Sequence, residues 1–164
     1  MQQEDLVFFS AALEVFRQAE SAFDIPKQSI LEMLPDAEVY HIGSTAIAGL
    51  LTKGDLDLLV CVAENRFADA DALLALRFDR NSRSMRTSKF ASFIASDLNP
   101  PLGIQLTTRD GDFATFLRFS ESLRLDSGLR AEYAQLKAGF EGRKMEEYRR
   151  AKDAFIERVL GQAP

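Results

Sequence analysis

Two short patterns, a Gly-Ser pair and an Asp-x-Asp pair, constrain the fold of this chain more than any other part of its sequence. Gly43-Ser44 follows residues 38–42, which have strand character, and Asp55-Leu56-Asp57 opens the apolar run 56–62. A continuous apolar run of this length predicts a buried strand. The Gly-Ser pair predicts a tight turn that leads into a short helix over residues 45–51. The order strand, turn, helix, strand predicts a mixed α/β core.

The acidic pair suits a divalent metal ion. Asp55 and Asp57 occupy positions i and i+2, which point to the same face of a strand. Two carboxylates held this close repel each other unless a cation lies between them. Mg²⁺ fits this position because it takes hard oxygen ligands, often one or two carboxylates together with substrate phosphates. We therefore expect Asp55 and Asp57 to be catalytic residues and metal ligands, with Mg²⁺ as the cofactor.

The Gly-Ser turn suits a phosphate group. Gly43 permits close approach of a ligand to the backbone. Ser44 and Thr45 begin the expected helix, whose free N–H groups and positive dipole end attract anions. Gly43, Ser44 and Thr45 are therefore candidate phosphate-binding residues for a nucleoside triphosphate. A nucleophile could then attack the α-phosphorus while the metal neutralises the developing charge.

Basic side chains outside these patterns are further candidates. Lys53 lies just before the acidic pair, and Arg86 and Lys89 lie in or next to the polar segment 79–86. Such cations can bind phosphates through charge-assisted hydrogen bonds, although an isolated surface cation is more commonly solvated. We include Lys53, Arg86 and Lys89 among the candidate nucleotide-binding residues.

The composition excludes several classes of protein. A formal net charge of −5 argues against general nucleic-acid binding, and one histidine excludes a multi-histidine zinc site. No apolar run approaches the roughly 20 residues that span a bilayer, so we expect no membrane partner. One cysteine excludes an intramolecular disulfide, and the acidic N-terminus lacks the positive start of a signal peptide. We expect a cytoplasmic protein.

The rest of the sequence predicts an α+β fold, with a small mixed sheet of about four strands, flanking helices and a helical C-terminal tail. The length of 164 residues favours one domain over residues 1–164, with 112–160 as its helical C-terminal part. The segment 79–86 is expected to be a loop. Periodicity and turn residues predict helices over 4–22, 26–35, 45–51, 66–76 and from 112 onward, and strands over 38–42, 56–62, 89–95 and 102–108.

From about residue 36 to 160 the sequence resembles the GrpB family, a branch of the nucleotidyltransferase superfamily with a polymerase-β-like fold. The superfamily pattern is a Gly-Ser that begins a helix, an Asp-x-Asp/Glu on the next strand, and a third acid on a later strand. Residues 41–50 are similar to the family stretch His-Ile-Gly-Ser-Thr-x-Val-Pro-Gly-Leu. The helical segments around 116–118, 132–137 and 148–152 are also similar.

This chain departs from the family pattern at two places that bear on chemistry. The family usually has an apolar residue where Asp55 stands, so this chain carries a fuller acidic pair. The later strand reads Gly-Ile-Gln-Leu-Thr-Thr over 103–108, and neither Gln105 nor Thr107, which share a face, is an acid. The third ligand and the general base therefore stay open, with Asp110 and Asp112 as substitutes just beyond the strand.

The resemblance also implies a cleft around the two patterns. Tyr133 and Lys137 lie four residues apart on one helix, as do Tyr148 and Lys152, so each pair shares a helix face. Residues at these positions commonly pack as core, whereas the resemblance implies that they line the cleft. The expected cleft residues are His41, Gln105, Tyr133, Lys137, Tyr148 and Lys152.

Three functions follow from these observations. The first is a Mg²⁺-dependent nucleotidyltransferase that moves a nucleoside monophosphate from a nucleoside triphosphate to an unknown acceptor. The second, motivated by the missing third acid, is a nucleotide-binding or regulatory module without catalysis. The third is a scaffold that retains only the fold and binds a protein partner.

Overall fold

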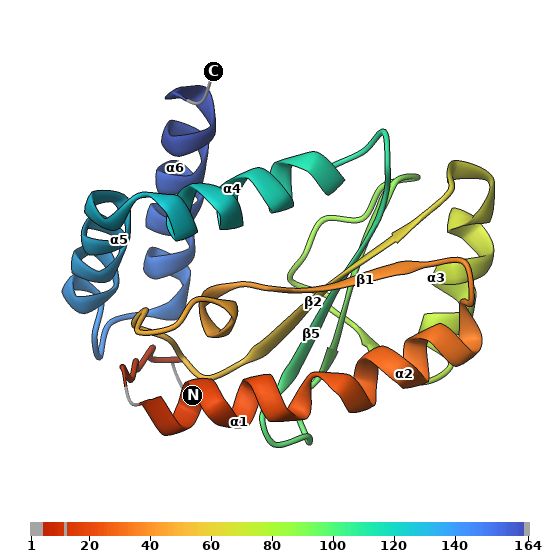
Figure 1. Ribbon diagram of the computed structural model, residues 1–164, viewed down its shortest axis with the longest axis horizontal. Coiled ribbons are helices and arrows are strands. Elements are labelled where there is room, and N and C mark those ends of the chain that lie inside the picture. The colour runs from red at the N-terminus through yellow and green to blue at the C-terminus, as the bar shows by residue number, and fades with distance from the viewer. Residues whose placement is uncertain (1–4, 12, 163–164) are drawn as a thin grey trace.

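The computed structural model describes residues 5–11 and 13–162, and it confirms the predicted α+β fold. Within this part of the chain the strands form one mixed sheet in the order β1-β2-β5-β4-β3 (Figure 1). Strands β2 and β5 run parallel, whereas the other neighbours run antiparallel. The short β3 lies inside the segment that we expected to be a loop, and it adds an edge strand. The strands are Glu38–Ile42 (β1), Leu56–Val62 (β2), Asp79–Arg80 (β3), Phe90–Ala95 (β4) and Leu102–Thr108 (β5).

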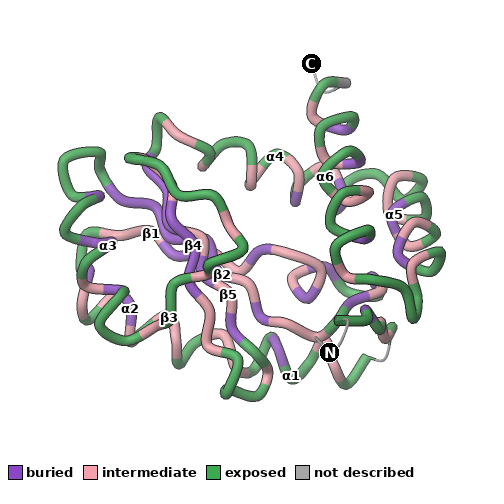
Figure 2. Tube along the Cα trace, turned by 180° about the vertical axis from the view of Figure 1, so that it is seen from behind, coloured by how far each residue is buried: buried purple, intermediate pink, exposed green. Residues whose placement is uncertain are grey.

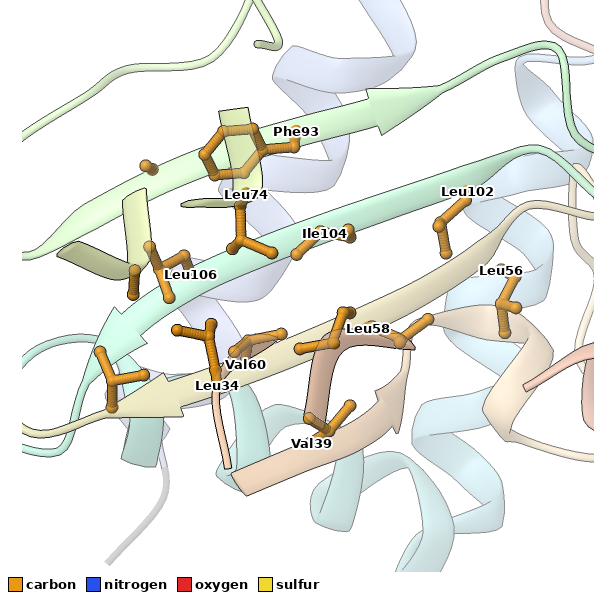
Figure 3. Packing of buried hydrophobic residues seen from close by; sticks show 14 of the residues in the cluster. Leu34, Val39, Leu56, Leu58, Val60, Leu74, Phe93, Leu102, Ile104 and Leu106 are labelled. Atoms are coloured by element: carbon orange, nitrogen blue, oxygen red, sulfur yellow. The ribbon is translucent and has the colours of Figure 1, made fainter. Parts of the chain in front are cut away.

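An apolar core lies between one face of the sheet and the first three helices. These are α1 (Leu13–Ala22), α2 (Asp24–Met33) and α3 (Phe67–Ala75). Because side chains alternate along a strand, Leu58 and Ile104 point to the same face and pack in one cluster with Leu74 of α3 (Figure 3). Burial of this apolar surface fixes the sheet against the helices.

The opposite face of the sheet is more polar and meets the C-terminal helices. It carries Asp57 on β2, with Gly103 of β5 as its register partner and Gln105 two residues further along β5. Helix α4 (Phe113–Leu125) contacts β1 and β2 here, and α5 (Ser127–Gly139) and α6 (Met145–Gln162) follow at one end of the molecule (Figure 1). A second apolar cluster joins these helices to the loop after β1, through Ile47, Leu50, Leu123, Tyr133, Phe155 and Val159.

Burial follows this arrangement. Figure 2 shows buried residues concentrated in the central strands and exposed residues along the outward sides of the helices. Among the described residues, no helix has both the length and the apolar character that crossing a membrane requires.

The predicted helix over residues 4–22 is wrong in its first half. Helix α1 begins only at Leu13, and residue 4 lies outside the described residues. Before it, Ser10 exchanges two backbone hydrogen bonds with Thr52, at 2.7 and 2.8 Å, and Leu6 forms a β-bridge with Lys144. Pairing with segments distant in the chain therefore holds this stretch extended, although its apolar residues have helical spacing.

The predicted helix over 45–51 is also wrong in extent. The structure contains a 3₁₀ turn at Ser44–Ala46 (η1), and between this turn and β2 the chain forms only turns and the β-bridge of Thr52 with Ser10. Ile47 and Leu50 are both buried against the C-terminal helices. Packing of this segment thus replaces the remaining helical turns.

Candidate functional site

A cavity of about 180 Å³ lies between the polar face of the sheet and helices α4, α5 and α6. Both sequence patterns reach it, the Gly-Ser pair from the end of β1 and the acidic pair from the start of β2. Ten of the residues proposed from sequence line it: Gly43, Ser44, Lys53, Asp55, Asp57, Gln105, Tyr133, Lys137, Tyr148 and Lys152. The fold therefore brings the Gly-Ser turn, the acidic pair and two helices to one hollow.

Asp57 lies in a slot between two glycines on neighbouring strands. Its register partners are Ile42 on β1 and Gly103 on β5. A Cβ atom on Gly43 would lie 2.5 Å from Asp57 Oδ2, and a Cβ on Gly103 would lie 2.6 Å from Oδ1. Both distances are far below van der Waals contact, so only glycine leaves room for this carboxylate. Gly43 also has a φ of 76°, which favours glycine.

Burial makes the carboxyl group of Asp57 hard to ionise. Burial raises the pKa of Asp57 to about 6. The carboxylate of Asp55 adds to this rise, whereas Lys152, Lys53 and Lys137 oppose it. A buried carboxyl with a raised pKa releases its proton more readily when a cation binds beside it.

Asp55 precedes β2 and lies within reach of Lys53. The Lys53 Nζ to Asp55 Oδ2 distance is 2.9 Å, and the Asp55 carbonyl accepts a 2.9 Å hydrogen bond from Thr45 Oγ1. Strand β2 starts only at Leu56, so Asp55 lies directly before the first residue of the strand. Both carboxylates nevertheless line the same cavity.

The donor set fits Mg²⁺ when substrate supplies further oxygens. Within residues 5–11 and 13–162, no group of three or more His, Cys, Asp or Glu side chains could hold a metal ion. Two carboxylates beside an open cavity match the way Mg²⁺ is commonly bound, through one or two carboxylates, water and substrate phosphates. Asp55 and Asp57 would hold the ion, with the cavity open to phosphate.

Thr45 and His41 lie behind the cavity wall. Thr45 is fully buried, and its hydroxyl lies 3.0 Å from His41 Nε2. The His41 ring stacks on Phe23 with a centroid distance of 5.3 Å. Burial, followed by the charge of Arg124, lowers the pKa of His41 to about 4, which keeps the ring neutral. These two residues connect β1 to the backbone of Asp55, and neither of them lines the cavity.

Thr52 is a central residue of the site that sequence analysis missed. Its Oγ1 accepts hydrogen bonds from Ser44 Oγ at 2.8 Å and from Gly54 N at 3.0 Å. Its backbone pairs with Ser10. Thr52 thus joins three segments: the stretch before α1 through Ser10, the Gly-Ser turn through Ser44, and the residues just before Asp55 through Gly54. A lone threonine in a loop carries no sequence signal for this role.

Lys137 is a buried lysine on α5, one of the three helices (α4, α5 and α6) that form the helical wall of the cavity. It is 1% exposed, and its Nζ donates a 2.6 Å hydrogen bond to the Leu51 carbonyl. The same Nζ lies 4.4 Å from the centre of the Tyr133 ring. Burial, followed by the charges of Lys152 and Lys53, lowers the pKa of Lys137 to about 7.

Tyr133 and Tyr148 complete this wall. Burial raises the pKa of Tyr133 to about 12, and burial also raises the pKa of Tyr148. Both rings are 3% exposed. The apolar remainder of the wall was absent from the sequence prediction because its residues have ordinary core spacing: Phe116, Phe119, Leu123 and Ile156.

Arg86 and Lys89 do not line the cavity. Arg86 and Arg80 both pair with Asp71 of α3, whose carboxylate is buried and needs these partners. The hydrogen bond from Arg80 contributes most to holding the pKa of Asp71 below its usual value. Lys89 pairs with Glu64 and Asp110. The expectation that Arg86 and Lys89 bind phosphate in this site is not supported by their placement.

Among the described residues that line the cavity, none corresponds to the third acid of the superfamily pattern. On β5, Gly103 leaves room for Asp57, and Gln105 lines the cavity with a neutral amide. Asp110, one of the two substitutes considered, is paired with Lys89. Neither it nor Asp112 is among the residues that line the cavity.

This chain is similar to known proteins over most of its length. The model of the family described as GrpB protein matches residues 14–162. The UPF0157 protein VC_A0354 of Vibrio cholerae is 36% identical over 160 residues, which cover 97% of this chain and 85% of that protein.

Solved structures show the same fold. The crystal structure of the conserved protein GrpB from Enterococcus faecalis matches with a TM-score of 0.75 and 21% identity, over 94% of this chain and 96% of that one. The Cid1 poly(U) polymerase with MgGTP bound matches with a TM-score of 0.52 and 18% identity, over 79% of this chain. The match covers 42% of the Cid1 chain, so that likeness concerns the nucleotidyltransferase-like fold alone. The family model and the Vibrio relative together establish that this chain belongs to the GrpB family.

Proposed function

We propose that this protein is a Mg²⁺-dependent nucleotidyltransferase that transfers a nucleoside monophosphate from a nucleoside triphosphate to an acceptor of unknown class. The observation that carries the proposal is the position of Asp57. Its carboxylate lies between Gly43 and Gly103 and lines one cavity with Asp55 and Ser44. The likeness of the fold to Cid1, whose structure contains Mg²⁺ and GTP, supports the reaction class.

The charges of the cavity match a metal-bound triphosphate. Asp55 and Asp57 offer oxygen ligands, and Lys53, Lys137 and Lys152 offer cations in the same hollow. Mg²⁺, when bound, supplies the charge neutralisation that transfer at the α-phosphorus requires. The lysines would hold the phosphate oxygens by charge-assisted hydrogen bonds.

In this reaction a nucleophilic atom of the acceptor loses its proton to solvent and forms a bond to the α-phosphorus. The bond from that phosphorus to the bridging oxygen breaks, and pyrophosphate leaves with the electron pair. The buried Lys137 is anchored on the Leu51 carbonyl and would bind the charge that develops on pyrophosphate. The apolar wall formed by Phe116 and Phe119 would exclude water from the reacting phosphorus.

The neutral β5 strand favours a second candidate, nucleotide binding without transfer. Gln105 lines the cavity on the strand where the superfamily carries its third acid. A glutamine amide offers only a neutral oxygen to a metal and does not act as a base near neutral pH. A regulatory module would need the same phosphate and metal contacts but no base.

Thermal unfolding with each of the four nucleoside triphosphates, with and without Mg²⁺, tests both candidates. A ligand at about 100 times its Kd stabilises the folded state by about 2.7 kcal/mol, and Tm then rises by several degrees. The Asp55→Asn/Asp57→Asn variant should lose the Mg²⁺-dependent rise. Asp69→Asn, which removes an exposed carboxylate of α3, is the matched control and should keep it.

A pyrophosphate-release assay separates the two candidates. Release that depends on Mg²⁺ and on Asp57 supports transfer, whereas a Tm rise without release supports the regulatory module. An equal Tm response in the wild type and the double variant, or no response to any nucleotide, contradicts both.

A further inference from the structure

Lys53 already acts as a counter-cation to the acidic pair. Its Nζ lies 2.9 Å from Asp55 Oδ2, and the two side chains are 33% and 35% exposed. Lys53 also lowers the pKa of Asp57 through its charge. The ammonium group therefore occupies the neighbourhood in which a metal ion bound by the two carboxylates would lie.

The backbone holds Lys53 in this position. Gly54, between the two paired residues, has a φ of 95°, a backbone conformation that favours glycine. Thr52 precedes Lys53 and is anchored by its backbone pairing with Ser10. Gly54 N donates to Thr52 Oγ1 at 3.0 Å. The ion pair is thus built into a turn that is fixed on both sides.

The charge balance of the cavity works against a free metal ion. Lys53, Lys137 and Lys152 line it with Asp55 and Asp57, so amino groups surround the two carboxylates. A divalent cation that enters alone is repelled by the Lys53 ammonium group, which is already paired with Asp55. It can reach both carboxylates only if the nearest ammonium moves away. The partial exposure of Lys53 allows that movement, whereas the buried Lys137 is held by the Leu51 carbonyl.

We propose that Lys53 competes with the divalent metal ion for Asp55. Metal binding displaces the ammonium group, which then pairs with the phosphate oxygens that the nucleotide brings. Lys53 therefore lowers the affinity for free metal and makes tight metal binding depend on the nucleotide. This inference rests on the proposed function, because it assumes the metal site at Asp55 and Asp57.

Binding of Mn²⁺ without nucleotide tests the competition directly. Isothermal titration or the electron paramagnetic resonance signal of free Mn²⁺ gives the Kd. Lys53→Met and Lys53→Gln should bind Mn²⁺ about threefold or more tightly than the wild type, because a repelling charge and a competing ion pair are removed. Lys53→Arg keeps the charge and should retain the weak affinity. Lys27→Met, which removes a lysine from α2, controls for net charge.

A second set of variants locates the effect. In an Asp55→Asn background, Lys53→Met should no longer tighten Mn²⁺ binding, because the shared carboxylate is gone. Equal Kd values for wild type and Lys53→Met overturn the inference, as does tightening that persists without Asp55. If Asp57→Asn binds Mn²⁺ as tightly as the wild type does, the metal site at Asp57 and the proposed function fail as well. If no variant binds Mn²⁺, the inference is overturned, and the Mg²⁺-dependent Tm rise with nucleotide decides the proposed function separately.

Discussion

The carboxylate of Asp57 and the backbone of Gly103 lie so close that a Cβ on Gly103 would come within 2.6 Å of Asp57 Oδ1. The two residues are register partners on parallel strands β2 and β5. The position of the carboxylate therefore depends on the absence of a side chain on the neighbouring strand. This relationship connects sheet packing directly with the proposed metal site.

Replacement of Gly103 by alanine should displace the Asp57 carboxylate. We expect a loss of about 1–3 kcal/mol in the free energy of unfolding, as for overpacking in a core. The Mg²⁺-dependent Tm rise with nucleotide should also fall. The matched control is Gly139→Ala on α5, where an added Cβ meets nothing within 4 Å. Urea denaturation gives the free energy of unfolding of both variants, and thermal unfolding with nucleotide gives the Tm rise. If Gly103→Ala changes neither quantity, the close fit of Asp57 against Gly103 is contradicted.

The raised pKa of Asp57 predicts a pH-dependent difference between the wild type and Asp57→Asn. The folded-state pKa is about 6, against an ordinary pKa of 3.8 for an aspartate, so between these values the folded state holds a proton that the unfolded state has released. Wild-type stability should therefore fall as pH rises from about 4 to 6, by roughly 2 kcal/mol from this group. Asparagine does not ionise, so the stability of Asp57→Asn should lack this contribution to the pH dependence.

Urea denaturation of both proteins at several pH values from 4 to 7 measures this difference. Contributions from other carboxyl groups cancel because both proteins share them. Asp57→Asn should gain stability relative to the wild type as pH rises. Parallel stability curves would show that Asp57 ionises normally in the folded protein.

The lowered pKa of Lys137 predicts a change of stability with pH that is opposite in sign to that of Asp57 and lies at higher pH. Its pKa is lowered from 10.5 to about 7, so between these values the unfolded state holds a proton that the folded state has released. Wild-type stability should rise with pH from about 7 to 10 through this group. Lys137→Met removes this dependence, so its stability relative to the wild type should decline over that range. Guanidinium denaturation at pH 7, 8.5 and 10 measures the change, and a constant difference would be inconsistent with a lowered pKa.

Thr52 should be needed for its hydroxyl and not only for its shape. Thr52→Val keeps the size of the side chain but leaves Ser44 Oγ and Gly54 N without their acceptor. Unsatisfied groups of this kind cost about 1–3 kcal/mol, so we expect a lower urea midpoint and weaker nucleotide binding. Thr52→Ser retains the acceptor and should recover most of both. Equal losses in the two variants would assign the role of Thr52 to packing.

Local patterns in the sequence were sufficient for most of the fold. Alternation and apolar runs located β1, β2, β4 and β5 because each strand has a buried face whose period is visible in the chain. The start of α5 is a local feature of the same kind, since the side chain of Asp126 accepts a 3.0 Å hydrogen bond from Leu129 N. The Gly-Ser and Asp-x-Asp patterns were visible for the same reason, since each of them lies within a few residues.

Only the tertiary structure decided which of the candidate residues meet. Lys137 reaches the Leu51 carbonyl across 86 positions of the chain, and Ser10 pairs with Thr52, which keeps the start of the expected first helix extended. Arg86 pairs with the buried Asp71 and not with the cavity. Hydrogen bonds and ion pairs of this kind depend on burial and on segments that approach each other only after folding. The sequence by itself therefore determined the strands and the local chemistry of the acidic pair, whereas packing of the C-terminal helices against the sheet decided the composition and charge of the site.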